Sequence, residues 1–178
     1  MTYKHEVFID GSNFYATVRL LDLRVDYARL RDWLISKGTT RINYLTAIYE
    51  DEDGNRELQK LADWLAYNGF TIISKPAKAK TNTAGERHIK GNMDVEIAVF
   101  ALQAGEYCDE ITLFTGDGDF ISLVKALQQK GVKVNVASSV KTQPQPIVAD
   151  ELRKQADVFI ELADIVYLIE IKNEVESD

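Results

Sequence analysis

Short apolar segments alternate with amphipathic segments along most of the chain, and this alternation limits the possible folds more than any other feature. The apolar segments are rich in β-branched and aromatic residues and have the length of strands, at residues 6–10, 42–49, 70–73, 111–115, 132–137 and 158–160. The amphipathic segments have apolar residues at helical spacing, over residues 26–37, 58–68, 95–102, 120–129, 148–155 and 163–171. Alternating strands and helices predict βα units, and therefore an α/β fold with a mostly parallel sheet.

The length of 178 residues predicts one domain, which we expect to span residues 1–172, followed by a short acidic tail at 173–178. The longest uninterrupted apolar run, residues 97–102, is far shorter than the ~20 residues of a membrane-spanning helix. No apolar signal segment precedes Asp10, and Cys108 is the only cysteine. We therefore expect a cytoplasmic protein with no disulfide, no cysteine-based zinc site and no membrane partner.

The charge of the chain is unevenly distributed. Its formal net charge is −7, which disfavours a general nucleic-acid-binding surface. Residues 74–91 nevertheless combine one acidic residue, Glu86, with five cationic ones: Lys75, Lys78, Lys80, Arg87 and Lys90. We find no periodicity in this segment and predict a basic loop. Such a patch on an acidic body can attract a polyanion.

Aspartates follow two of the predicted strands and begin one of the predicted helices. Asp10 ends the first strand, and Asp117 and Asp119 lie in the glycine-rich turn after residues 111–115. Asp94 lies in the first turn of the helix that follows the basic segment. In open α/β sheets, ligands bind beyond the carboxyl ends of the strands, so we expect these segments to meet at one edge.

Each of these motifs also has a purely structural interpretation. Ser12 or Asn13 would serve as a helix cap after the first strand. Asp119 would cap an ordinary turn, and Asp94 would be favourable at a helix N-terminus because of the helix dipole. Taken together, the four carboxylates indicate a cation site, which no single motif does, because clustered carboxylates repel one another unless a cation is bound. Ligands that are all oxygen favour Mg²⁺ or Mn²⁺, and phosphodiester hydrolysis is the common reaction of such sites.

Three stretches that carry these aspartates resemble the NYN domain family, the LabA-like branch of the PIN-like ribonuclease fold. They are residues 7–14 (VFIDGSNF), 90–95 (KGNMDV) and 113–120 (LFTGDGDF), and residues 151–160 are similar to the family's end. The resemblance covers residues 6–162 in the expected order. It implies a three-layer α/β/α sandwich around a parallel sheet, with a metal-dependent ribonuclease site.

The resemblance also implies roles for individual residues. The acidic metal-site residues would be Asp10, Asp94, Asp117 and Asp119. Asn13 would act with them by orienting substrate or water. The residues expected to contact substrate are Ser12, Thr115, Lys90 and the basic residues Lys75, Lys78, Lys80 and Arg87. Many relatives have a second aspartate six residues after the one that matches Asp94, where this chain has Phe100, so the choice between one and two metal ions stays open.

We therefore predict a Mg²⁺- or Mn²⁺-dependent endoribonuclease that acts on single-stranded or structured RNA. Two alternatives stay open. The first is a non-catalytic RNA- or protein-binding module with the same fold, because a fold does not imply a function. The second is a phosphohydrolase of small nucleotides. Homodimer formation is also left open.

Overall fold

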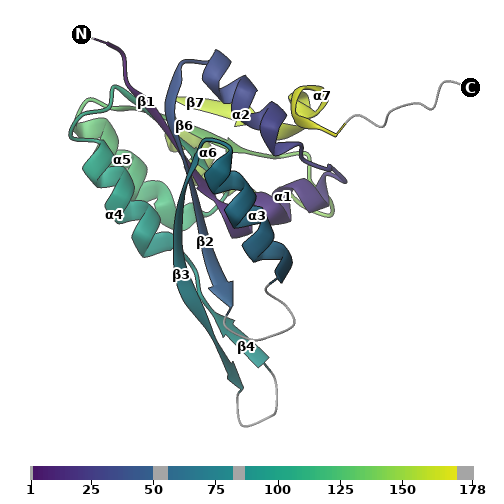
Figure 1. The fold of residues 1–178 in the computed structure, drawn as a ribbon. Coiled ribbons are helices and arrows are strands. Elements are labelled where there is room, and N and C mark those ends of the chain that lie inside the picture. Colours follow the sequence, from purple (N-terminus) through teal and green to yellow (C-terminus); the bar gives the residue numbers. More distant parts are fainter. Residues whose placement is uncertain (1, 50–55, 82–86, 172–178) are drawn as a thin grey trace, which may run out of the picture.

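The computed structural model of the protein describes residues 2–49, 56–81 and 87–171, except for the side chains of Tyr49 and of residues 78–81 and 87–90. Within these ranges, one sheet has the strand order β4-β3-β2-β1-β5-β6-β7 (Figure 1). The strands are β1 (His5–Asp10), β2 (Thr39–Tyr49), β3 (Phe70–Thr81), β4 (Arg87–Lys90), β5 (Glu110–Phe114), β6 (Lys133–Ser138) and β7 (Val158–Glu161). Six of them are parallel, and β4 pairs antiparallel with β3 at one edge.

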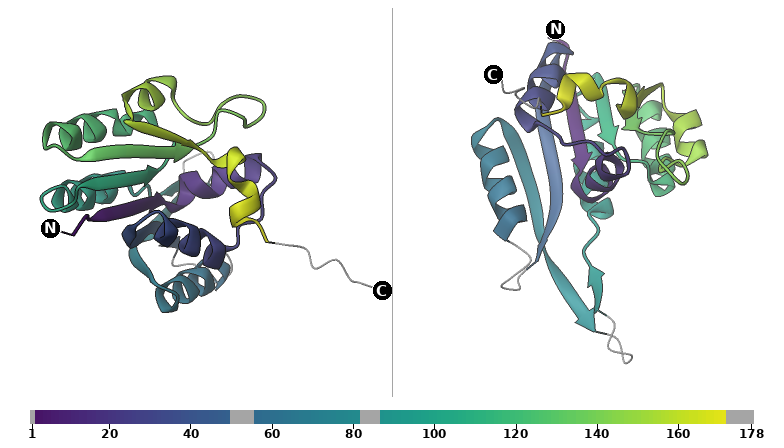
Figure 2. Two further views of the ribbon diagram at one scale, coloured as in Figure 1. Left: turned by 90° about the horizontal axis from the view of Figure 1, so that it is seen from above. Right: turned by 90° about the vertical axis from the view of Figure 1, so that its right-hand side faces the viewer.

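Helices cover both faces of this sheet (Figures 1 and 2). One face packs against α4 (Asp94–Ala104), α5 (Ile121–Gln129) and α6 (Asp150–Gln155). The other packs against α1 (Gly11–Leu20), α2 (Tyr27–Ser36), α3 (Arg56–Tyr67) and α7 (Val166–Ile169). Two short 3₁₀ helices, η1 (Gly118–Phe120) and η2 (Leu162–Asp164), complete the described elements. The three-layer α/β/α fold predicted from the sequence is confirmed.

The central strand β1 shows why the sheet is covered on both faces. Successive side chains of a strand point to opposite faces. Phe8 belongs to the hydrophobic cluster under α4 and α5, whereas Val7 and Ile9 belong to the cluster under α1 and α2. A strand buried on both sides is an apolar run, which is how this segment reads in the sequence.

The topology places a ligand site at the end of β1. Strand β1 lies between β2 and β5. After β1 the chain adds β2 and β3 on one side of it, and it later adds β5 and β6 on the other side. The crevice beyond the carboxyl ends of two strands at such a switch point is where open α/β sheets bind ligands. Asp10 ends β1, and the turn with Asp117 follows β5.

The structure corrects the predicted basic loop. Strand β3 extends from Phe70 to Thr81, so residues 74–77 continue the sheet beside β2, and residues 78–81 form a two-stranded ribbon with residues 87–90 of β4. The ribbon projects beyond the rest of the molecule on the side where β2 ends (Figures 1 and 2). The prediction was wrong because the alternation of lysine and alanine in residues 77–80 is itself a strand pattern, although neither residue type favours strands.

Two helices also differ from the sequence-based prediction. Helix α1 (Gly11–Leu20) was not predicted as an element, although Phe14 and Val18 are buried at helical spacing. The helix predicted over residues 163–171 is only the short α7, preceded by η2. The tail at 173–178 lies outside the described residues. None of the helices in the described part of the chain has the length and apolar character needed to cross a bilayer.

Candidate functional site

Asp10 connects the first strand to the first helix. It is the N-cap of α1, and its Oδ1 accepts hydrogen bonds from the Asn13 N–H at 3.2 Å and the Ser12 hydroxyl at 2.9 Å. Its Oδ2 accepts a longer bond from the Thr115 hydroxyl, at 3.4 Å. Burial raises the pKa of Asp10, which is only 5% exposed, and these hydrogen bonds act in the opposite direction. The helix cap expected at Ser12 or Asn13 is therefore Asp10 itself.

The turn after β5 is fixed to the turn after β1. The Gly116 N–H donates a 2.8 Å hydrogen bond to Oδ1 of Asn13. A Cβ on Gly116 would lie within 2.9 Å of Val148 Cα and 2.8 Å of the Ile147 carbonyl oxygen, so only glycine fits this close approach. The Thr115 hydroxyl accepts the Asp117 N–H at 3.2 Å, which orients the chain just before the acidic residues.

Asp117 and Asp119 lie at the start of η1. Oδ1 of Asp117 accepts the Asp119 N–H at 2.9 Å, so Asp117, and not Asp119, caps this turn. Both structural interpretations of these motifs were therefore right about capping and wrong about the capping residue. Capping alone does not distinguish a structural role from a functional role for Asp117 and Asp119, because both also converge with a third aspartate.

Asp94 completes a cluster of three carboxylates. One oxygen of each of Asp94, Asp117 and Asp119 lies within 4.8 Å of those of the other two. Asp94 and Asp117 are half-buried, and Asp119 is exposed. Partial burial raises the pKa of Asp94, as do the negative charges of Asp10, Asp117 and Asp119, while Lys75 opposes the rise. This acidic cluster, defined as Asp94, Asp117 and Asp119, fits a hard cation, because its donors are all oxygen and their spacing allows them to share one ion.

Asp10 lies close to the acidic cluster but is not part of it. Its charge contributes to the raised pKa of Asp94, yet both of its oxygens already accept hydrogen bonds from its own turn and from Thr115. The sequence grouped Asp10 with the other three carboxylates. The geometry makes it the buried neighbour of the cluster.

Phe100 does not occupy the acidic cluster. A residue six positions after Asp94 is rotated about 240° around a helix axis, onto a different face. Ala98, four positions on, instead lies with Asp94 and Asp119 along an apolar groove of about 370 Å³ between α4 and α5. Phe100 is 40% exposed and does not line this groove. In this chain, the residue at position 100 therefore has no direct effect on the cluster.

The basic residues divide into two groups. Lys75 forms an ion pair with Glu96 on α4, with 2.7 Å between Nζ and Oε2, so it is held beside Asp94. The side chains of Lys78, Lys80, Arg87 and Lys90 lie outside the described part of the chain. The register of the ribbon nevertheless places Lys78 opposite Lys90 and Lys80 opposite His88. Strand β4 ends at Lys90, four residues before Asp94.

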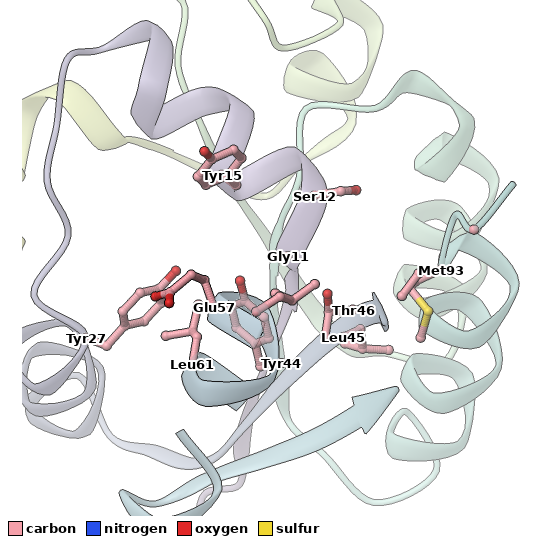
Figure 3. Close-up of a pocket in the computed structure, with 13 residues that line it drawn as sticks. Gly11, Ser12, Tyr15, Tyr27, Tyr44, Leu45, Thr46, Glu57, Leu61 and Met93 are labelled. Atoms are coloured by element: carbon pink, nitrogen blue, oxygen red, sulfur yellow. The ribbon is translucent and has the colours of Figure 1, made fainter. Parts of the chain in front are cut away.

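Besides the acidic cluster and the basic residues, the site includes a cavity that was not predicted from the sequence. A cavity of about 440 Å³ lies beside the acidic cluster and is lined by Tyr15, Tyr27 and Tyr44, among other residues (Figure 3). These tyrosines come from α1, α2 and β2. They are separated by 12 and 17 residues, so no local motif connects them.

Comparison with known proteins shows the family of the chain. The NYN domain family matches residues 4–165, which is most of the chain. The chain belongs to the NYN domain family. It is 28% identical over 169 residues to the low amplitude and bright protein LabA of Synechococcus elongatus, an alignment that covers 92% of this chain and 86% of LabA.

Two solved structures are similar to this NYN domain to different degrees. A protein of unknown function from Vibrio parahaemolyticus superposes with a TM-score of 0.69 at 22% identity, covering 90% of this chain and 93% of that one. A mutant of the T5 5′-exonuclease gives a TM-score of 0.47 at 13% identity, covering 84% of this chain and 55% of that one. The first of these shares the fold with this NYN domain.

Proposed function

We propose that this NYN domain is a divalent-metal-dependent endoribonuclease, with Mg²⁺ or Mn²⁺ bound at the acidic cluster. One observation carries the proposal: Asp94, Asp117 and Asp119 converge from α4 and from the turn after β5 at the switch point of the sheet. Three carboxylates at this spacing repel one another. The pKa of Asp94 is raised first by partial burial and then by the charges of Asp10, Asp117 and Asp119. A bound cation would remove that repulsion.

The residues around this ion would have different roles in binding the metal and the substrate. Asp94, Asp117 and Asp119 would hold it directly, which revises the assignment of Asp10 as an equal ligand. A divalent ion at this position supplies positive charge to a phosphate oxygen and lowers the pKa of water. Asn13, whose Oδ1 accepts the Gly116 N–H, keeps its NH₂ group as a donor toward the substrate. Asp10 would fix the Ser12 and Thr115 hydroxyls and add negative charge behind the cluster.

The substrate is inferred to be a polyanionic chain, and RNA is the chain that the family resemblance favours. The ribbon of β3 and β4 carries Lys78, Lys80, Arg87 and Lys90 and projects beyond the carboxyl end of β2 (Figure 2). Asp117 and Asp119 follow the carboxyl end of β5, which runs in the same direction. A chain of phosphates that crosses the acidic cluster can also contact this ribbon. A longer polyanion gains more such phosphate contacts than a free nucleotide does.

The decisive test is cleavage of RNA by the purified protein. A 5′-labelled RNA with one stem and one single-stranded arm is incubated with Mn²⁺, with Mg²⁺ or with EDTA. We expect internal cleavage that requires the metal and falls about 100-fold or more in Asp94→Asn, because several kcal/mol of transition-state stabilisation depend on the ion. Asp63→Asn is the matched control, since Asp63 is an exposed aspartate on α3 outside the site.

Two results would contradict the proposal. Equal cleavage by Asp94→Asn and wild type, purified in the same way, would assign the activity elsewhere. RNA binding without cleavage under any metal condition would favour the binding module, which shares the fold without the chemistry.

A further inference from the structure

The tyrosine-lined cavity next to the acidic cluster has no role in the function proposed above. It lies between α1, α2 and α3 at the carboxyl end of β2 (Figure 3). Tyr15 and Ser12 project from α1 on one side, and Tyr27, Tyr44 and Leu61 lie on the other. Its volume of about 440 Å³ is within the usual range of small-ligand sites. We call it the tyrosine pocket.

Two of the three rings are held rigidly by the core. Tyr44 is 2% exposed and lies against Gly11, where an added Cβ would be 2.8 Å from its ring. Tyr27 meets Tyr44 edge to face, with 6.1 Å between ring centroids, and meets Phe70 in the same way at 6.3 Å. Rings fixed in this way can bind a flat ligand with little further loss of conformational entropy.

Tyr15 forms the accessible side of the pocket. It is 56% exposed, and no core contact requires its ring. The Arg19 guanidinium lies 5.6 Å from its ring centroid, which places a cation near the pocket mouth. An exposed aromatic ring next to a cation is a typical stacking surface for a nucleic-acid base.

The charge of the pocket selects an uncharged occupant. None of the described residues that line it is cationic, and its one carboxylate, that of Glu57, is paired with Lys60 at 3.0 Å. A phosphate is therefore disfavoured inside. The hydroxyls of Ser12, Thr46 and the tyrosines can still donate or accept hydrogen bonds, which a planar heterocycle can use.

Three residues that line the pocket are chain neighbours of Asp94 or of Asp10, the buried neighbour of the acidic cluster. Gly11 and Ser12 follow Asp10 directly, and Met93 immediately precedes Asp94. The Ser12 hydroxyl itself donates to Asp10. A ligand with an uncharged ring in the pocket would therefore present its next group to the carboxylates. A nucleotide has this arrangement of a neutral ring and a neighbouring phosphate.

We propose that the tyrosine pocket binds the base of the nucleotide next to the phosphate at the acidic cluster. The proposal rests on the proposed function, since it assigns the phosphate to that cluster. It names the substrate more closely: an RNA whose base is unpaired and unstacked at this position. A base inside a duplex is already paired and stacked, so it cannot enter the pocket.

The test compares two fluorescein-labelled RNA octamers, one with all its bases and one with abasic sites at every position, each in EDTA and in Ca²⁺, a hard cation that carboxylate oxygens bind. Binding is measured by fluorescence anisotropy, so no cleavage is needed. We expect wild type to prefer the octamer with bases. Tyr15→Ala should weaken that binding by about 5- to 150-fold, the range that corresponds to the loss of one stacked base, and leave abasic binding unchanged. Tyr15→Phe should retain the preference, since it keeps the ring.

Two further variants separate stacking in the pocket from other effects. Leu61→Trp should also lower binding of the octamer with bases, because it fills the pocket from α3. Tyr67→Ala is the matched control, since Tyr67 is 90% exposed on α3 and does not line the pocket. Circular dichroism melts establish that each variant is folded.

Each outcome bears on the proposal. Equal effects of Tyr15→Ala and Tyr67→Ala, or no preference for bases in wild type, would overturn it, even if the protein cleaves RNA with Mn²⁺. A base preference that depends on Tyr15 would support it, even if cleavage is never seen. Competition by nucleoside monophosphates as strong as that by the octamer would overturn the assignment of the pocket to RNA, because it would show that the pocket binds free nucleotides equally well.

Discussion

Two of the aspartates at the candidate site have two effects at once. Asp10 and Asp117 each accept a backbone N–H as a helix cap, and each adds negative charge to one edge of the sheet. Loss of a cap costs about 0.5–2 kcal/mol of stability, whereas loss of a charge here relieves repulsion. Replacement by asparagine is therefore more informative than replacement by alanine, because it keeps an oxygen that can cap.

Asp94 does not cap a helix, so its replacement reports on repulsion more directly. Without metal, we expect Asp94→Asn to melt above wild type at neutral pH, by the 2–4 °C that ~1 kcal/mol gives in a domain of this size. Folding raises the pKa of Asp94, so the folded state binds this proton more tightly than the unfolded state does. This contribution to stability is present below the ordinary value of 3.8 and is lost as the pH rises through the raised pKa.

The advantage of Asp94→Asn should therefore be largest at neutral pH and disappear on acidification. Thermal melts in EDTA across the pH range measure it, with Asp63→Asn as the control for a surface aspartate. If Asp94→Asn melts below wild type at every pH, the carboxylate is stabilising and the repulsion argument is wrong.

At the scale of elements, close backbone contact holds the two turns of the site together. Gly116→Ala would place a Cβ 2.8 Å from both the Ile147 carbonyl oxygen and Ser138 Oγ. We expect a loss of about 1–3 kcal/mol in the free energy of unfolding, which is typical of overpacking. Gly118→Ala is the matched control, because its closest contact would be 3.1 Å. Urea denaturation of both variants measures the difference, and equal losses would contradict the argument.

The basic ribbon gives a second prediction at this scale. Each phosphate contact on a single strand contributes about 0.7 to the slope of log affinity against log salt. We expect Lys78→Glu with Lys80→Glu to weaken RNA binding and to reduce that slope by about 1.4. Lys4→Glu with Lys37→Glu changes the charge equally, but these residues precede β1 and β2 at the opposite end of the strands.

Fluorescence anisotropy over a series of salt concentrations compares the two double variants. An unchanged slope in the ribbon variant, or the same loss in both variants, would show that the ribbon makes no specific phosphate contacts.

The elements differ in how far the sequence predicted them, for physical reasons. Strands β1, β5 and β6 are buried on both faces, so apolar residues dominate their central positions and make these strands easy to recognise. The ribbon depends on pairing between β3 and β4, and lysine and alanine carry little strand preference of their own. Helix α1 begins inside the Asp10 motif, so the turn signal was recognised and the helix was not.

At the scale of the whole molecule, the candidate site is a consequence of topology. The sequence placed three acidic segments at one edge, because parallel strands all end there. It gave no signal for the tyrosine pocket, since Tyr15, Tyr27 and Tyr44 meet only after α1, α2 and β2 have packed. It also gave no way to separate Asp10 from the other three carboxylates, because that depends on which oxygens are already hydrogen-bonded.

The stability of the whole domain should report metal binding at the acidic cluster. A ligand that binds only the folded state stabilises it, by about 2.7 kcal/mol at 100 times its dissociation constant. In a domain of this size that corresponds to a rise of about 5–10 °C in the melting temperature. We expect Mn²⁺ to give such a rise in wild type and in Asp63→Asn. Asp117→Asn should show a smaller rise, because it keeps the capping oxygen and loses an anionic ligand.

Differential scanning fluorimetry with Mn²⁺ and with EDTA, at matched ionic strength, measures these shifts. In EDTA, Asp117→Asn should have a higher melting temperature than wild type. With Mn²⁺, wild type should have the higher melting temperature. A general effect of salt would shift all three proteins equally. Mn²⁺ shifts that are the same in wild type and Asp117→Asn, or absent from wild type, would therefore remove the acidic cluster as the metal site and, with it, the chemical basis of the proposed nuclease.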